Sequence, residues 1–250
     1  MESLATTLAP APAPAPRPFS PGAVIGRSFS TWFANLVPFS IVTLTVNLPV
    51  FLLAALAPDE ERPELDRLQM FVSSLADLIV IGALTHGVLQ ALNGTAAPLG
   101  ALFRRGFTRW GPVARVSIAY ALLVFLGLGL LVVPGVIAAC VWYVAIPAVV
   151  VEDRGAFAAL ARSRALTKGS RWAVLVVALV VFAVTVATGA ASAAVGTFAP
   201  ALPHPVAPLL ATAIGALVTP LGACAAAVAY HDLRVAKEGV DTAALVKVFE

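Results

Sequence analysis

The chain has 250 residues, of which 60% are apolar and only 12% are charged. Soluble proteins carry about 25% charged residues, and a folded domain of this size still exposes a large surface that needs polar cover. The composition therefore excludes an ordinary soluble enzyme, a disordered chain and, with two cysteines, a secreted disulfide scaffold. It predicts an all-α membrane protein that crosses the bilayer several times.

The first 20 residues differ from the rest in composition. Residues 1–20 alternate Ala and Pro over much of their length, which favours an extended, solvated tail. Such a tail is either a disordered leader or a docking segment for a partner. We expect the membrane domain to follow over residues 21–235, and a short cytoplasmic amphipathic segment over residues 236–250.

Long stretches without charge predict six membrane-spanning helices. A bilayer core of about 30 Å needs about 20 helical residues. The longest uncharged stretch runs from Arg171 to Asp232 and is long enough for two such helices. The predicted spans are residues 34–57, 68–92, 111–133, 136–151, 172–194 and 206–230.

The stretch between Arg115 and Glu152 is also too long for one span, and it contains Pro134 and Gly135 near its middle. Proline removes a backbone donor, and glycine adopts unusual dihedral angles. We therefore expect a tight hairpin turn at Pro134 and Gly135, with a kink or a re-entrant segment as the alternatives.

The basic residues predict how the chain is oriented. With these six spans, all 16 Lys and Arg residues except Arg62 and Arg67 fall on one side, and the first loop on the other side holds five of the 13 acidic residues. Cytoplasmic loops of membrane proteins are enriched in Lys and Arg. The basic side, with both termini, is therefore predicted to be cytoplasmic, in a bacterial inner membrane.

Three basic segments resemble one another and precede predicted spans. Each combines small and apolar residues with Arg and ends on Trp. Short basic helices with an apolar face lie in the headgroup region, where Trp is also enriched. We interpret the segments as three repeats of a short cytoplasmic interfacial helix followed by a transmembrane hairpin; the alternative is three unrelated flanks. The aligned residues are Arg27, Arg105 and Arg162, and Trp32, Trp110 and Trp172.

A more specific pattern lies in the third basic segment and near the C-terminus. Residues 134–172 read PGVIAACVWYVAIPAVVVEDRGAFAALARSRALTKGSRW, and residues 230–241 read YHDLRVAKEGVD. This pattern resembles a family of bacterial integral membrane proteins that includes the membrane domain joined to some glycerophosphodiester phosphodiesterases. The matching residues are Pro134, Gly135, Pro147, Glu152, Ser163, Leu166, Thr167, Lys168, Gly169, Tyr230, Asp232, Leu233, Arg234, Glu238, Gly239 and Asp241.

The resemblance implies a six-helix membrane domain and no established activity. In that family the phosphodiesterase activity belongs to a separate soluble barrel with metal-binding acids and paired histidines, which has no counterpart in these 250 residues. We therefore expect a stand-alone relative of the membrane domain, without that activity.

The third basic segment holds the first candidate site. Its basic side chains are suited to bind anionic lipid headgroups or phosphate at the inner surface. The alternative is an ordinary flank that only sets the topology. The candidate headgroup residues are Arg162, Arg164, Lys168 and Arg171.

Charged residues at the ends of two spans predict structural ion pairs. Glu152 closes the fourth span, and Asp232 and Arg234 follow the sixth. We expect Asp232 to pair with an arginine of the third segment and so to tie the C-terminus to it. The candidate partners of Asp232 are Arg162, Arg164 and Arg171.

Asp77 is the only charged residue inside a predicted span. Acidic residues are costly within a bilayer and often mark functional sites. Ser73 lies one helical turn earlier and shares the face of Asp77. Two interpretations follow: a proton or cation pathway, or an acid near the outer interface that is hydrogen-bonded to Ser73 or to a neighbouring helix.

The sequence contains no familiar catalytic or metal-binding motif, so we expect no enzyme activity and no cofactor. The basic residues belong to membrane flanks and predict anionic lipids, rather than nucleic acid, as partners. A protein partner or a second copy is a further possibility. The leading hypothesis is a non-enzymatic scaffold, regulator or membrane-homeostasis factor. The alternatives are a small transporter or channel that uses Asp77, and a membrane-embedded lipid-modifying enzyme.

Overall fold

The computed structural model describes residues 18–56, 63–153, 155–198 and 206–239. Within these residues the chain forms nine α-helices and no β-strand, which confirms the all-α prediction. The Ala/Pro tail and the last amphipathic residues, 240–250, lie outside the described residues. The helices are α1 (Pro21–Ala34), α2 (Leu36–Leu56), α3 (Pro63–Leu92), α4 (Leu99–Leu130), α5 (Val132–Trp142), α6 (Ala145–Glu152), α7 (Ala156–Thr167), α8 (Arg171–Phe198) and α9 (Val206–Glu238).

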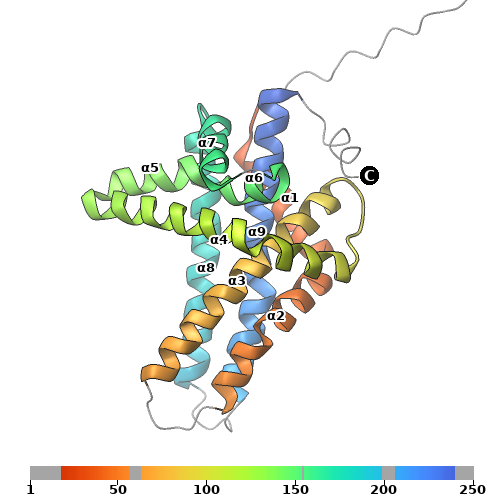
Figure 1. Ribbon diagram of the computed structural model, residues 1–250, viewed down its shortest axis with the longest axis vertical. Helices are drawn as coiled ribbons and strands as arrows, with labels where there is room; N and C mark the ends of the chain where they lie inside the picture. The colour runs from red at the N-terminus through yellow and green to blue at the C-terminus, as the bar shows by residue number, and fades with distance from the viewer. Residues whose placement is uncertain (1–17, 57–62, 154, 199–205, 240–250) are drawn as a thin grey trace, which may run out of the picture.

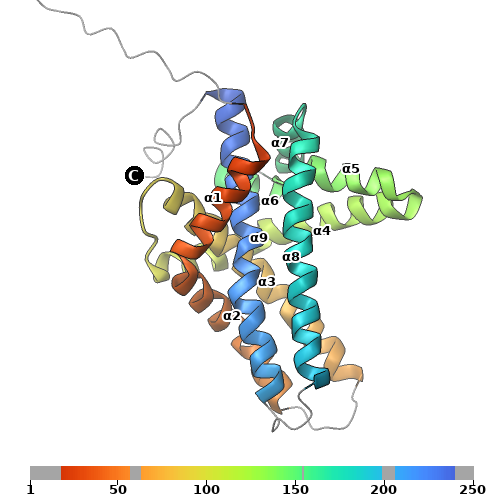
Figure 2. The same ribbon diagram turned by 180° about the vertical axis from the view of Figure 1, so that it is seen from behind.

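Four long helices, α2, α3, α8 and α9, run along the longest axis of the molecule (Figure 1). Each of the pairs α2–α3 and α8–α9 reverses direction at the same end of the bundle. Helix α9 contacts α2, α3 and α8 and therefore lies at the centre. The opposite end holds α1, α6, α7 and the last turns of α9 (Figure 2). We call it the basic end, because Arg27, Arg162, Arg234 and Lys237 lie there.

Several helical segments are long enough and apolar enough to cross a membrane. There are five among the described residues, or six if α1 and α2, which meet at a bend of 75°, form one span. These segments fit a membrane-spanning protein, as the composition predicts. The five are Phe71–Leu92, Leu99–Leu130, Val132–Glu152, Arg171–Val195 and Leu209–Glu238.

The bend between α1 and α2 has a local cause. Helix α1 ends at Ala34, and the N–H of Asn35 donates to the Thr31 and Trp32 carbonyls at 3.1 and 3.2 Å. Pro38 has no N–H for the Ala34 carbonyl, and its ring would clash with that carbonyl in a continuous helix. The chain therefore changes direction before α2 begins.

Helices α4 and α5 form a hairpin that lies across the direction of the four long helices (Figure 1). The turn is at Leu131, whose backbone is extended, and not at Pro134 and Gly135, which lie in the first turn of α5. Close packing of the two helices explains the need for glycine. A Cβ added to Gly127 would lie 2.9 Å from the Gly135 Cα, so no side chain fits there without movement.

The second basic segment differs from the predicted interfacial helix. Residues 99–110 and the apolar residues after them form one continuous helix, α4, through Gly111 and Pro112. The buried residues Leu102, Gly106 and Val113 lie on one side of α4. A Cβ added to Gly106 would lie 2.7 Å from the Ile79 carbonyl oxygen of α3, so α3 packs closely along this part of α4. The second segment therefore has no separate helix of its own.

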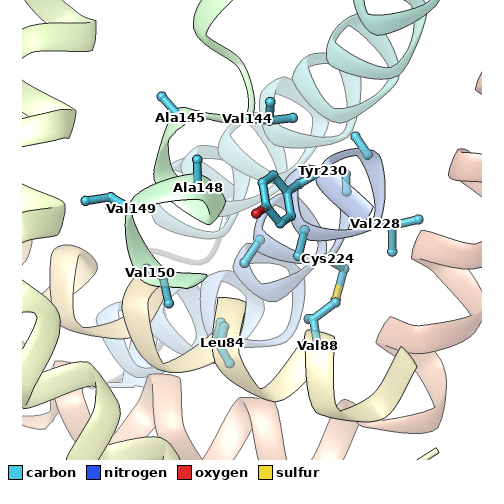
Figure 3. Packing of buried hydrophobic residues seen from close by; sticks show 14 of the residues in the cluster. Leu84, Val88, Val144, Ala145, Ala148, Val149, Val150, Cys224, Val228 and Tyr230 are labelled. Carbon is cyan, nitrogen blue, oxygen red and sulfur yellow. The ribbon is translucent and has the colours of Figure 1, made fainter. Parts of the chain in front are cut away.

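The buried core lies towards the basic end. Five of the eight residues of α6 are buried there. Figure 3 shows α6 packed near Cys224, Val228 and Tyr230 of α9. Leu84 and Val88 of α3 belong to the same cluster. Large apolar side chains along α8 are exposed instead, and Phe182 keeps 64% of its surface. Exposed apolar surface of this extent is typical of helices that a bilayer covers.

Candidate functional site: the charged network and cationic patch at the basic end

A network of charged side chains joins α6, α7 and α9. Arg162 of α7 lies between two carboxylates: its Nε donates to Glu152 Oε1 at 2.6 Å, and its Nη1 lies 2.5 Å from Glu238 Oε1. Glu238 also accepts a hydrogen bond from Arg234 Nε at 3.0 Å. The hydrogen bonds from Arg162 to Glu238 and Glu152 raise its pKa above the ordinary value, so it stays charged. We call Glu152, Arg162, Arg234 and Glu238, with Tyr230, the ionic network.

Tyr230 connects this network to the core. Its side chain is buried, and its hydroxyl donates to Glu152 Oε1 at 2.8 Å. Tyr230, Arg234 and Glu238 are spaced four residues apart and therefore share one face of α9. Arg234 Nη1 lies 3.4 Å from the Tyr230 hydroxyl, which completes the connection along that face. The ionic network thus fixes α9 to the ends of α6 and α7.

Asp232 does not pair with any of the three arginines expected from the sequence. It forms an ion pair with Arg27 of α1 and lies 3.0 Å from the Nδ1 of His231. Asp232 and Arg234 are two residues apart, about 200° around the helix, so Asp232 points away from α7 and towards α1. Arg162, moreover, already contacts two other carboxylates. The sequence drew attention to Arg27 only as one of three aligned arginines.

Two arginines of α4 bind the C-terminal end of α6. Arg105 Nη2 donates to the Val150 carbonyl at 3.2 Å, and both terminal nitrogens of Arg109 contact the Asp153 carboxylate. Asp153 follows α6 with a left-handed backbone, φ 53°. Its hydrogen bond with Arg109 lowers the pKa of the Asp153 carboxyl below its ordinary value. Cations near the carbonyl end of a helix also interact favourably with its dipole.

Hydroxyls of α7 bind the carbonyl left free by the break between α5 and α6. The Val141 carbonyl accepts hydrogen bonds from Ser163 Oγ at 2.9 Å and from Thr167 Oγ1 at 3.1 Å. Both hydroxyl residues are fully buried. In a continuous helix the Val141 carbonyl would accept from the N–H of Ala145, where α6 begins, and Pro147 has no N–H for the Tyr143 carbonyl in the same break. Ser163 and Thr167 belong to the motif that carries the family resemblance, but their bonding to this break was not foreseen from the sequence.

Lys237 fixes the end of α9 to the end of α7. Its Nζ donates to the carbonyls of Ala165, at 3.1 Å, and Lys168. Gly169 follows with φ +86°, a conformation that favours glycine and commonly ends helices. Unpaired carbonyls at a helix C-terminus attract cations, so Lys237 caps α7. No sequence pattern indicates this contact, because the two residues are 69 positions apart.

The four candidate headgroup residues fall into two groups. Arg162 is inside the ionic network, whereas Arg164, Lys168 and Arg171 are exposed, and none of their side chains forms an ion pair with any described residue. We call these three residues the cationic patch. Phe157 and Trp172, which are 85% and 82% exposed, lie on the same helices, α7 and α8. Basic and aromatic side chains together are typical of a membrane interface.

Asp77 lies on the exposed side of α3, and Ser73 of the same helix is partly buried. Among the described residues, no hydrogen bond or ion pair involves the Asp77 carboxylate. Asp77 lies near the middle of α3, one helical turn after Ser73, whereas the candidate residues of the basic end lie on other segments of the chain.

The next question is whether the described part of the chain holds a candidate metal site. No group of three or more His, Cys, Asp and Glu side chains there is arranged to hold a metal ion. Cys140 and Cys224 are buried as free thiols.

Residues 61–233 match the model of a protein family that is described as a domain of unknown function, DUF7847. The chain belongs to this family. No curated protein and no solved structure matches the chain. The DUF7847 region includes Glu152, Arg162, Tyr230 and Asp232, and it leaves out Arg27 of α1.

Proposed function

We propose that this DUF7847 protein spans a bacterial inner membrane several times, with the basic end and both termini in the cytoplasm. Several helices are long and apolar enough to cross a bilayer, and with the six spans predicted from the sequence all but two of the 16 basic residues fall on one side. Helices α1 and α7 and the end of α9 gather at the basic end (Figure 2). Enrichment of Lys and Arg marks the cytoplasmic side of membrane proteins.

We further propose a non-enzymatic role as a scaffold or regulator of the membrane, in which the cationic patch binds anionic lipid headgroups. One observation carries this proposal: Arg164, Lys168 and Arg171 are exposed and have no ion pair among the described residues, although Arg162 nearby is neutralised by two acids. Cations held at a membrane surface attract anionic lipids by about 1 kcal/mol each.

Lipid binding tests this role. Removing all three charges in Arg164→Ala, Lys168→Ala, Arg171→Ala should weaken retention of phosphatidylglycerol by about 100-fold, since about 3 kcal/mol is lost. Native mass spectrometry of the protein, released from detergent with stepwise addition of lipid, measures this retention.

Two controls accompany the measurement. The charge-conserving variant Arg164→Lys, Lys168→Arg, Arg171→Lys should keep the lipid, and Arg67→Ala, which removes an exposed cation from α3, should leave retention unchanged. Equal retention by the triple-alanine variant and the natural chain would refute the role of the cationic patch.

A small transporter or channel that uses Asp77 is the second candidate. It is favoured by one observation, an acidic side chain at an exposed position of an apolar helix. Proton and cation flux into liposomes should then fall in Asp77→Asn. Absence of flux in the natural chain, or equal flux in both, would remove this candidate.

The resemblance to the membrane domain of glycerophosphodiester phosphodiesterases belongs to the same proposal. It is supported by the motif residues at the basic end, of which Glu152, Ser163, Thr167, Tyr230 and Asp232 all take part in contacts between helices. It suggests a shared scaffold and assigns no activity to this chain.

A further inference from the structure

We propose that the α4–α5 hairpin does not cross the membrane, but lies within the cytoplasmic leaflet, parallel to the membrane plane, with lipid acyl chains around its apolar surface. The chain would then cross the bilayer four times, through α2, α3, α8 and α9. The proposal rests on the orientation proposed above only for the choice of leaflet.

The direction of the hairpin is the first argument. Figures 1 and 2 show α4 and α5 lying across the long axis along which α2, α3, α8 and α9 run, at the level of α6 near the basic end. Helices that share one bilayer can tilt, on average by about 20°. If the four long helices cross the membrane, a hairpin that lies across them follows the membrane plane instead.

The lengths of the apolar segments do not decide the placement. Leu99–Leu130 and Val132–Glu152, which joins α5 and α6, have 32 and 21 residues and are long and apolar enough to cross a bilayer. After Arg115, the last charged residue of α4, 15 residues remain to the end of the helix at Leu130, about 22 Å of helix. The placement of the hairpin therefore rests on its direction and on its surface.

The surface of the hairpin identifies lipid as its surroundings. The half of the hairpin near its turn is apolar, and the side chains of Phe125, Leu130 and Leu131 are 78%, 73% and 68% exposed. The other half of α4 exposes Trp110 together with Arg104 and Arg115. An apolar segment that continues into exposed arginines and an exposed tryptophan fits acyl chains beside anionic headgroups. The charges of Arg104 and Arg115 thus complement the lipid.

Connectivity permits either arrangement, so topology alone does not decide between them. Because α4 and α5 run antiparallel, the ends of their packed parts lie together, away from the turn at Leu131. Two crossings and no crossing therefore leave the sidedness of every other helix unchanged. The depth of the hairpin in the bilayer is what distinguishes them.

Spin labels at one introduced cysteine per variant measure that depth. The probes on α4 are Ile118→Cys, Leu122→Cys and Gly129→Cys, all at exposed positions on one face of the helix. The matched controls are Val176→Cys and Val186→Cys, which are exposed on α8. Exposed positions remove little packing, and the buried native Cys140 and Cys224 stay in place, with their background read from the natural chain.

Collision rates with oxygen and with a water-soluble nickel complex, in phosphatidylglycerol-containing vesicles, give the depth of each label. We expect the three α4 labels at one depth within the acyl region, and the two α8 labels at depths that differ by about 15 Å, as expected for ten residues along a spanning helix.

Three results would overturn the proposal. The first is a difference of about 16 Å between positions 118 and 129, which a spanning hairpin requires. The second is low oxygen access with dipolar coupling between labels, which shows that a second copy covers α4. The third is full access to the nickel complex, which shows water around the hairpin.

The orientation is tested separately. A cysteine at Ser3, treated with a membrane-impermeant maleimide on sealed vesicles, reports on which side the tail lies. Labelling from the periplasmic side of the membrane would refute the proposed cytoplasmic placement. Equal depths of the three α4 labels would then still show an in-plane hairpin, but in the other leaflet.

Discussion

At the residue scale, the arginines of the basic end serve two different purposes. Arg162 points into the ionic network and contacts Glu152 and Glu238, whereas Arg164, two residues later, is exposed. A half-turn of α7 separates their directions. Loss of Arg162 would remove one ion-pair partner from the largely buried Glu152, and loss of Arg164 would remove only a surface charge. The two residues are alike in sequence and different in physical role.

The pair of Arg27 and Asp232 gives a direct test at this scale. Asp232→Arg alone should destabilise the protein by about 3 kcal/mol, because it places a cation beside Arg27 at a site where the aspartate is 9% exposed. The double variant Arg27→Asp, Asp232→Arg should recover much of that loss. Thermal unfolding in detergent measures both changes.

A matched pair of variants controls for the alternative partner. Arg171→Asp combined with Asp232→Arg should give no recovery, because Arg171 is exposed on α8 and forms no ion pair with Asp232. Recovery by this second pair, and none by the first, would show that the contact between α1 and α9 is assigned wrongly.

Asp153 predicts a dependence on pH. Its pKa is lowered by the hydrogen bond with Arg109, so the contact stabilises the folded state when the pH lies above the unfolded pKa of about 4. That stabilisation is lost as the pH falls through the lower folded pKa. Because Asp153 is mostly exposed, the effect should be small. As the pH is lowered from about 6 to 3, the melting temperature of Asp153→Asn should fall by less than that of the natural chain. An equal fall of the melting temperature in both proteins would contradict the contact.

The chemistry of the site was predictable from the sequence, but its pairings were not. The expectation that Glu152, Asp232 and Arg234 lie at the ends of spans follows from where the uncharged stretches stop, although α9 itself continues to Glu238. The partner of Asp232 depends on how far α9 is rotated and on the bend that brings α1 against it. Both depend on contacts between distant parts of the chain, so the spacing of residues in the sequence does not predict them.

At the element scale, the hairpin depends on Gly127 of α4 and Gly135 of α5, each of which faces the other helix. A Cβ on Gly127 would lie within 3.1 Å of three backbone atoms around Pro134 and Gly135. Gly127→Ala should therefore push α4 and α5 apart and lower the melting temperature. Gly129→Ala is the matched control, since nothing lies within 4 Å of its added Cβ and Ala favours a helix by about 1 kcal/mol.

A pair of spin labels on Leu126→Cys and Ile137→Cys, both exposed, measures the separation of the two helices. The distance should increase with Gly127→Ala and stay constant with Gly129→Ala. An unchanged distance and melting temperature in Gly127→Ala would show that the helices are not in close contact at this point.

The helices themselves were largely predictable, because apolar stretches and prolines mark them. Each predicted span overlaps a helix of the structure. The continuity of α4 through Gly111 and Pro112 was not predictable, because it depends on packing against α3, where Gly106 approaches the Ile79 carbonyl. The turn at Leu131, three residues before Pro134, likewise follows from the contact of Gly127 with Gly135.

At the scale of the whole molecule, apolar surface is distributed unevenly. The basic end holds a buried core around Tyr230, while α8 and the hairpin expose large apolar side chains such as Phe182 and Phe125. Composition alone predicted a membrane protein, and the five to six apolar helical segments agree with it. Composition does not contain the direction of each helix, so the hairpin that lies across the other long helices was not predictable from it.

The position of the bilayer relative to these helices is the central claim of the account. A cryo-EM map of the protein in a nanodisc that contains anionic lipid tests it most directly. We predict a lipid band that surrounds α2, α3, α8 and α9 lengthwise, holds the α4–α5 hairpin along its edge at the basic end, and shows headgroup density at Arg164, Lys168 and Arg171. A band that α4 and α5 cross from one face to the other, or one that leaves the hairpin outside, would contradict it.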